Sequence, residues 1–469
     1  MKTYTPTIGI EVHAELKTKT KMFCNSLNAP HAAQPNVHVC PICMAHPGTL
    51  PVINKTAVKH VLKVGIAIQG TLASYTEFDR KNYFYPDIPK GYQISQYLYP
   101  LVVGGNLNGV AITRVHLEED TARSLHDQGE GSIVDYNRAG VPLMELVTEP
   151  VIHDAKTAGD FARELQLTLR TLGVSDANME KGEMRVEANI SVSDTHIYGT
   201  KVEVKNLNSF KSVEGAIEFE IKRQIELIEK GEKVIQETRG WDEVKGKTFS
   251  QRVKESANDY RYFPDPDLPK LSITMSEEFS HSRLNEELPE LPVEKRVKYK
   301  DLGLSREQSE ILVSDFRLGS FFDSVLIQAD NNADVAKLVG NYLTSDLLPL
   351  FEKRGFEIVP NSKTFAELMS MVANDEISSR VAKDLLVEVV FEDKDPHNLA
   401  TERNLMQSSS AEALHPLIDE IIKNHESVVA EYRAGKESAL QFLLGQGMKL
   451  SRGSANPKML MDLFKQRLS

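Results

Sequence analysis

Hydrophobic and polar residues alternate strictly in several short stretches of the N-terminal half of the chain. In residues 8–16 (IGIEVHAEL) one face is entirely apolar, and the other carries Glu11, His13 and Glu15. A period of two residues predicts a strand with one buried face. The polar face carries acidic side chains again in further strand-like stretches, which are residues 115–120, 143–149, 184–192 and 201–205.

Helical periodicity separates these strands. Apolar residues recur every three or four positions and predict helices at residues 56–69, 154–172 and 212–230, each followed by glycine. Strands and helices mixed in this way predict an α+β domain, in which one apolar sheet face packs on helices and one acidic face lines a cleft. After a proline-rich segment near residue 290 the pattern is wholly helical, with a further break at residues 407–410. We therefore expect three domains: residues 1–290, 291–405 and 406–469.

Residues 78–96 mix cations, aromatic residues and turn formers without a period, which predicts a surface loop. Such a loop can be simply solvated, with packed tyrosines. Alternatively it faces a substrate, so that Arg80 and Lys81 contact phosphate and the aromatic rings stack on an adenine or on the end of a tRNA.

Composition narrows the classes of function. The formal net charge of −12 excludes a protein that binds nucleic acid over its whole surface, although six basic residues face two acidic ones from Lys436 onward. That tail is either a solvated helical pair or an appended RNA-binding module. No apolar run approaches the ~20 residues that span a bilayer, and the N-terminus lacks a signal-peptide pattern. With only three cysteines, we expect a cytoplasmic protein without a membrane segment.

The acidic strand faces predict a metal site. Clustered carboxylates repel one another unless a cation lies among them, and oxygen ligands with an imidazole suit Mg²⁺ or Mn²⁺. Magnesium in such a cleft indicates nucleotide phosphates. The chain has no G-x4-G-K-[ST] motif, which argues against a P-loop enzyme.

All three cysteines fall within twenty residues, as Cys24 and the pair Cys40-x2-Cys43. This clustering predicts a structural zinc site that joins two loops, with buried or free thiols as the alternative. Ser26 stands where a fourth cysteine would complete the set, so the fourth ligand would be His38, His31 or water.

Several motifs together give the chain a family resemblance. It resembles the B subunit of the bacterial tRNA-dependent aspartyl/glutamyl amidotransferase, known as GatB, in IGIEVHAEL, CPIC, FDRKNYFYPDIPKGYQISQ, HLEED, NRAGVPLMELVTEP, GEMRVEANISV, EVKNLNSF, DYRYFPDPDLP and GQGMK…GSANP. These motifs run in order along nearly the whole chain.

The resemblance implies a glutamine-synthetase-like antiparallel-sheet cradle, then an all-helical domain and a small helical YqeY-like tail. It further implies that ATP phosphorylates the side-chain carboxylate of Glu or Asp misacylated onto tRNA(Gln) or tRNA(Asn). Ammonia, released from glutamine by the A subunit, then displaces the phosphate to give the amide. A C subunit would hold the A and B subunits together in a heterotrimer, and the helical parts would recognise the tRNA body.

Carried over by motif, the Mg²⁺ ligands would be Glu11, His13, Glu145 and Glu119, the second glutamate of HLEED. The same resemblance implies phosphate or substrate contacts by Lys81 and, more weakly, by Lys205. One conflict is visible, because simple alternation from the histidine of HLEED sends Glu118, not Glu119, into the cleft. A bulge or twist would have to intervene for Glu119 to be the ligand.

The chain also departs from the family pattern. Zinc-bearing members have a C-x-C pair where this chain has Cys24-Asn25-Ser26, and some members lack these cysteines altogether. Zinc therefore cannot be essential to the chemistry. In GEMRVEANISV, Glu187 takes a place where the family commonly has Asp, which weakens its claim to be a direct ligand.

Two other classes of function compete with this interpretation. A free-standing ligase for a small carboxylic acid shares the acidic cleft but leaves the basic tail unexplained. A non-enzymatic tRNA-binding scaffold would make the acidic strands a solvated sheet face. The absence of an amidase signature fits a subunit that takes its ammonia from a partner.

Overall fold

The computed structural model describes residues 3–125, 131–253, 260–354, 361–407, 411–451 and 455–468. The chain divides into two compact units, Met1–Pro292 and Val293–Ser469. The domain boundary near residue 405 stays a prediction. Four features named from the sequence lie outside the described residues: Asp259 of DYRYFPDPDLP, residues 408–410 of the expected break, Arg452 of the basic tail, and residues 453–454 of GSANP.

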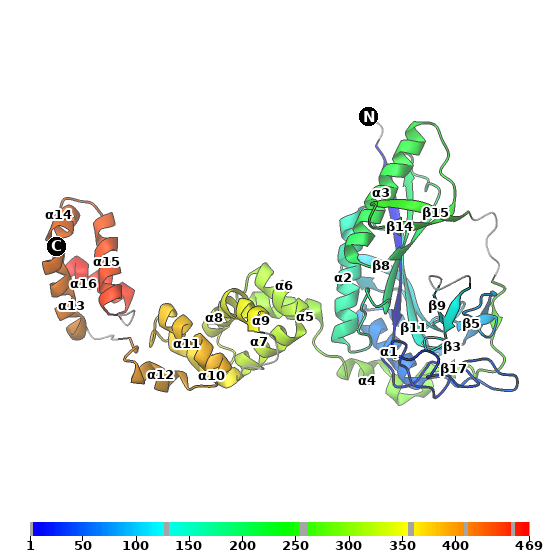
Figure 1. Ribbon diagram of the computed structural model, residues 1–469, viewed down its shortest axis with the longest axis horizontal. Coiled ribbons are helices and arrows are strands. Elements are labelled where there is room, and N and C mark those ends of the chain that lie inside the picture. The colour runs from blue at the N-terminus through cyan, green and yellow to red at the C-terminus, as the bar shows by residue number, and fades with distance from the viewer. Residues whose placement is uncertain are drawn as a thin grey trace. The chain divides into compact units, whose positions relative to one another are not determined.

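A ten-stranded sheet forms the centre of the first unit (Figure 1). Its middle strands, in spatial order, are β13 (Val202–Leu207), β12 (Met184–Ser193), β1 (Thr5–Glu15), β11 (Pro142–Thr148) and β8 (Val110–Glu119). They are antiparallel, as expected, whereas β13 pairs in parallel with β14 (Glu237–Asp242). The outer strands are β15 (Lys247–Val253), β6 (Val102–Val103), β7 (Asn106–Leu107) and β2 (Thr71–Leu72).

Helices cover the apolar face of this sheet. The apolar side chains of β1, such as Ile8, Ile10 and Val12, are fully buried in one core with residues of α1 (Lys55–Ala67) and α2 (Ala155–Thr171). Figure 1 shows α2 lying beside α3 (Phe210–Glu229), with which it is in contact. The side chains of Asn54, Asp154 and Ser209 accept backbone N–H groups and cap the three helices. The predicted α+β architecture is confirmed.

The expected surface loop at residues 78–96 is instead a pair of antiparallel strands. Strand β4 (Asp79–Asn82) pairs with β5 (Tyr92–Ser95) and with β16 (Phe263–Pro264). No apolar alternation indicates these strands, because Ile94 is their only buried apolar side chain and the other buried positions, Asp79, Gln93 and Ser95, are polar. Asp79 Oδ2 accepts the backbone N–H of Tyr97 at 2.9 Å. Two further small sheets pair β3 (Tyr75–Thr76) with β17 (Leu271–Ser272) and β9 (Arg123–Leu125) with β10 (Ile133–Asp135).

The second unit is helical. After α4 (His281–Glu286) of the first unit, its helices are α5 (Pro292–Asp301), α6 (Arg306–Ser314), α7 (Phe316–Gln328), α8 (Ala333–Tyr342), α9 (Leu348–Arg354), α10 (Ser362–Ala373), α11 (Ser379–Phe391), α12 (Pro396–Glu402), α13 (Ala411–Asn424), α14 (Glu426–Arg433), α15 (Ser438–Leu450) and α16 (Pro457–Leu468). Helices α13 to α16 share a hydrophobic core of their own around Ile418, Leu443 and Phe464. Among the described residues, no helix combines the length and apolar character needed to cross a membrane.

Candidate active site

The face of the sheet opposite the helices gathers acidic and imidazole side chains from three neighbouring strands. In the register of β1, β11 and β8, His13 lies opposite Glu145, and Glu145 lies opposite His116. Because paired residues of adjacent strands point to the same face, the three side chains form a row across the sheet. Glu11 and Glu118 extend this row, each two residues away along its strand. We call these five residues the acidic cluster.

Glu145 is at the centre of the acidic cluster. One of its oxygens, Oε2, lies 3.3 Å from Nε2 of His13 and 3.3 Å from Nε2 of His116. His13 Nε2 is also 3.8 Å from Oε1 of Glu11 and 3.8 Å from Oε1 of Glu118. The cluster contains two groups of three possible metal ligands, and Glu145 belongs to both. One group is Glu11, His13 and Glu145, and the other is His116, Glu118 and Glu145. Within each group the candidate ligand atoms lie within 4.8 Å of one another.

Burial and mutual charge shift the acid–base properties of the acidic cluster. Burial raises the pKa of Glu11 to about 7, and the charge of Glu145 adds to this effect. Burial alone would lower the pKa of His13, but its hydrogen bond to Glu145 and the surrounding carboxylates raise that pKa to about 9. Conversely, His116 and His13 outweigh the effect of burial on Glu145 and hold its pKa well below the usual value. Crowded, buried carboxylates with imidazole are a donor set that fits Mg²⁺ or Mn²⁺.

The two glutamates of HLEED point in different directions. Strand β8 pairs with β11 without a register shift from Val115 to Glu119, so no bulge interrupts the alternation there. Glu118 therefore joins the imidazoles, and Ser95 Oγ donates a hydrogen bond to its Oε2 at 3.0 Å. Glu119 points away, where it accepts the Ile94 backbone N–H at 3.0 Å and pairs with Lys90 at 2.7 Å. The position of Glu119 does not support the Mg²⁺-ligand role implied by the resemblance, and Glu118 stands in its place.

Lys81 brings a positive charge to the acidic cluster from strand β4. Burial alone would lower the pKa of its ammonium group, but Glu118, Tyr262 and Glu145 outweigh that effect and raise it. The ammonium nitrogen also lies 5.3 Å from the ring centroid of Tyr260. Lys81 is therefore a protonated group within the field of the candidate metal ligands.

Arg80, the preceding residue, is not brought to the acidic cluster. Its Nε donates to Asp265 at 2.9 Å and its second guanidinium nitrogen to Asp267 at 2.8 Å. The guanidinium carbon lies 4.3 Å from the centroid of the Tyr92 ring. These contacts use two of the five guanidinium N–H groups. Alternation along β4 sends Arg80 and Lys81 to opposite sides, so only Lys81 faces the acidic cluster.

Lys205 lies at the edge of the acidic cluster. Its Nζ is 2.7 Å from Oε2 of Glu187 and 3.5 Å from Oε1 of Glu203. Burial alone would lower the pKa of Lys205, and these two carboxylates raise it. Since Glu187 lies opposite Glu11 in the register of β12 and β1, Lys205 supports that end of the cluster through Glu187.

Three members of the site were not predicted as site residues, namely His116, Arg114 and Ser95. Arg114 Nε donates to His116 Nδ1 at 3.4 Å, and its guanidinium lies 3.6 Å from Oε1 of Glu145. The shared parity of residues 114, 116 and 118 could have indicated His116 and Arg114. Nothing in the sequence could have indicated Ser95, because the pattern around it predicts a loop.

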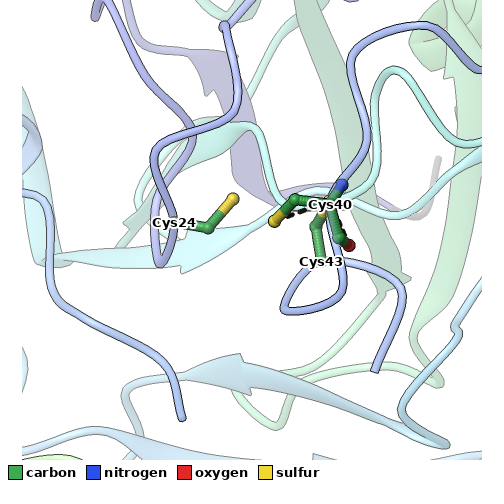
Figure 2. Close-up of side chains that lie close together, drawn as sticks. All are labelled: Cys24, Cys40 and Cys43. Atoms are coloured by element: carbon green, nitrogen blue, oxygen red, sulfur yellow. Dashed lines mark hydrogen bonds between the residues drawn. The ribbon is translucent and has the colours of Figure 1, made fainter. Parts of the chain in front are cut away.

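The three cysteines converge as the sequence predicts (Figure 2). Their sulfur atoms lie within 4.8 Å of one another, and the Cys40 and Cys43 sulfurs are 3.8 Å apart. The backbone N–H of Cys40 donates to Cys43 Sγ at 3.1 Å. The hydrogen bond with Cys24 lowers the pKa of Cys43 to about 4, and a nearby Lys21 ammonium contributes. Three convergent sulfurs, one of them easily ionised, fit three of the four ligands of a structural zinc site.

Neither histidine considered as a fourth ligand is grouped with the three sulfurs among the described residues. His31 Nε2 instead lies 3.3 Å from Oε1 of Glu183, and the backbone N–H of His38 donates to Asn137. Two other groups lie 3.9 Å from Cys43 Sγ: the hydroxyl of Ser26 and the ammonium of the fully buried Lys21. A hydroxyl and a cation are weak substitutes for a fourth thiolate.

Fold and site together define an α+β protein with a candidate divalent-cation site on the polar face of its sheet. The chain belongs to the GatB family: residues 6–278 match the model of the GatB/GatE catalytic domain, and residues 320–468 match that of the GatB domain. The family resemblance seen in the sequence, and the assignment to an amidotransferase enzyme family that it carried, are thereby confirmed.

Curated relatives match over the full length. The B subunit of an aspartyl/glutamyl-tRNA(Asn/Gln) amidotransferase from Moorella thermoacetica is 43% identical, covering 99% of this chain and 100% of its own. Proteins of the same name from Caldicellulosiruptor saccharolyticus and Thermoanaerobacter pseudethanolicus are 41% and 40% identical, each covering 99% of both chains.

Proposed function

We propose that the chain uses ATP to activate the side-chain carboxylate of Glu or Asp misacylated onto tRNA(Gln) or tRNA(Asn), and then amidates it. The names of its full-length relatives support the tRNA-linked substrate. The acidic cluster is the single observation that carries the activation step, because it offers a buried candidate divalent-cation site on the polar face of the sheet.

The chemistry explains why such a site is needed. A carboxylate is a poor acyl donor, so one of its oxygens first attacks the terminal phosphorus of ATP and ADP leaves. Ammonia then attacks the carbonyl carbon of the acyl phosphate, loses a proton, and inorganic phosphate leaves as its bond to that carbon breaks. Both steps concentrate negative charge, and catalysis of phosphoryl transfer consists largely of positioning and neutralising that charge.

Each part of the acidic cluster has a role in this proposal. Glu11, His13, Glu118 and Glu145 would hold Mg²⁺, which when bound would neutralise the terminal phosphates of ATP. Lys81 stays protonated at neutral pH because of the carboxylates around it, so it can hold the substrate carboxylate or the transferring oxygens. Lys205 would keep Glu187 away from Glu11 rather than contact phosphate.

Partners complete the reaction. We place the chain in a cytoplasmic heterotrimer, in which an A subunit releases ammonia from glutamine and a C subunit holds the other two together. The full-length relatives are named as B subunits, which supports a multisubunit enzyme. The helical second unit would bind the tRNA body, and zinc on the three cysteines would be structural.

The test is reconstitution of the chain with candidate A and C subunits, followed by an amidation assay with ATP, Mg²⁺, glutamine and Glu-tRNA(Gln) or Asp-tRNA(Asn). We expect wild type to form the amidated tRNA, and Glu118→Gln to bind tRNA but release ADP on the order of a hundredfold more slowly. ADP formation that needs free glutamate but no tRNA would favour the free-standing ligase. Binding of tRNA by wild type without any chelator-sensitive ATP turnover would favour the scaffold and contradict the proposal.

A further inference from the structure

Four tyrosine rings form a continuous row beside the acidic cluster. Tyr83 packs edge-to-face on Tyr260 with centroids 5.7 Å apart, and Tyr260 packs in the same manner on Tyr262 at 6.2 Å. Tyr262 then stacks on Tyr97, with centroids 4.5 Å apart and ring planes only 14° apart. We call these four residues the tyrosine row.

The tyrosine row lies beside the acidic cluster at Tyr260, and its Tyr83 end continues to the exposed Tyr85, with ring centroids 6.1 Å apart. Lys81 links the two, since its ammonium lies over the Tyr260 ring and within the field of Glu118. At the other end, Tyr97 is 57% exposed although its inner face is stacked on Tyr262. The backbone N–H of Tyr97 donates to the buried Asp79, which fixes the backbone at this position, and the stack on Tyr262 holds the ring.

We propose that the outer face of Tyr97 stacks on the terminal base of the substrate tRNA. This inference rests on the proposed function and deepens it. The carboxylate that reacts at the acidic cluster is joined through an aminoacyl ester to the terminal ribose, so the terminal base must lie a short chain of bonds away. The tyrosine row leads over such a span from Lys81 to an open aromatic face.

The chemistry of the row favours a base over other occupants. Unpaired bases stack on aromatic rings, and a tyrosine pair held parallel extends this stack by one more plane. Tyr97 is anchored before binding, so little conformational entropy is lost when a flat ligand covers it.

The experiment compares two inhibitors of the reconstituted three-subunit enzyme. The first is 3′-deoxyadenosine carrying glutamate through a 3′-amide, and the second is the same compound without the base. Tyr97→Ala is compared with Tyr97→Phe and with a matched control, Tyr198→Ala, since Tyr198 is 72% exposed and lies outside the tyrosine row. We expect Tyr97→Ala to lower the affinity of the enzyme for the adenosine compound about tenfold, which is a typical contribution of one stacked base. The Phe and Tyr198 variants should leave its affinity unchanged.

The compound without the base should bind wild type about tenfold more weakly and be insensitive to Tyr97→Ala. Equal inhibition by the two compounds on wild type, or equal affinity of the adenosine compound for wild type and Tyr97→Ala, would overturn the inference. A Tyr97→Ala variant that fails only to assemble with its partner subunits would also overturn it, because the row would then be a subunit contact. If wild type is inhibited by neither compound and turns over no ATP, the proposed function fails instead.

Discussion

The first unit contains two candidate metal sites of opposite construction. The acidic cluster comes from three paired strands, so the register of the sheet fixes which side chains meet. The cysteine site comes from bends and turns between residues 20 and 45, where no ladder of hydrogen bonds sets the spacing. A site built on strands can therefore be predicted from alternation, whereas a loop site can be predicted only by residue type.

The two sites also differ in completeness. The acidic cluster offers two overlapping groups of three donors, because His116 and Glu118 supplement Glu11 and His13 around Glu145. Within the described residues, the cysteine site has three sulfurs and no fourth ligand of comparable strength. The sheet site is therefore suited to a catalytic role, whereas the cysteine site is suited to a structural role that the chemistry does not require.

The largest expected effect comes from Glu145, which both ligand groups share. Glu145→Ala should lower ATP-dependent phosphorylation of the aminoacyl-tRNA on the order of a thousandfold, because cation and imidazoles lose their common partner. Glu149→Ala is the matched control, since Glu149 accepts a hydrogen bond from the Thr113 hydroxyl and lies outside the cluster. If Cys43→Ser lost as much phosphorylation activity as Glu145→Ala, this result would contradict the claim that only the sheet site is needed for the chemistry.

The next effect separates the two neighbouring glutamates. Glu118→Gln should weaken Mg²⁺ binding to the enzyme and reduce phosphorylation on the order of a hundredfold. Glu119→Gln should leave Mg²⁺ affinity intact but cost about 1–3 kcal/mol of stability, because the Lys90 ammonium loses its carboxylate partner. Calorimetric titration of Mg²⁺ and denaturant unfolding measure the two quantities. The reverse outcome would restore the ligand assignment implied by the family motif.

A third prediction concerns Glu15, which follows the cluster on β1. Burial, together with the charge of Asp120, raises its pKa from 4.5 to about 8. The folded state therefore keeps a proton that the unfolded state releases, so the free energy of unfolding should fall as pH rises from about 4.5 to 8. Glu15→Gln should remove on the order of 3 kcal/mol of that pH-dependent loss. Denaturant unfolding across this pH range, with the exposed Glu180→Gln as control, measures it; equal slopes for Glu15→Gln and wild type would contradict the shift.

The smallest effect tests whether the loop site is incomplete. Ser26→Cys should raise zinc affinity by at least about tenfold, since even an outer-shell partner contributes about 10–100-fold. Competition with a chromophoric chelator gives the affinity. Amidation should not change in this variant or after zinc removal; a loss of activity on zinc removal would show that the loop supports the sheet site directly.

Alternation predicted the fold of the sheet and most of the acidic cluster, because strand side chains obey a fixed period. It also favoured Glu118, whereas the motif pointed to Glu119, and the structure follows the alternation. The structure of residues 78–96 was not predictable in this way, since Ile94 is the only buried apolar residue of β4 and β5, and β4 also pairs with the distant β16. Because these residues are far apart in the sequence, the sequence also could not show that the Arg80 guanidinium donates hydrogen bonds to Asp265 and Asp267.

Strand β8 has a consequence for how its sequence can vary. The side chains of His116 and Glu118 point to one side of the strand, and that of Glu119 points to the other. The contacts of each residue therefore depend on whether its position in the strand is odd or even. Inserting or deleting a single residue after His116 would turn each following side chain to the opposite side of the strand. Glu119 would then no longer point toward Lys90. We expect this strand to tolerate conservative replacements far better than any change in length, so its length is constrained more strictly than its residue types.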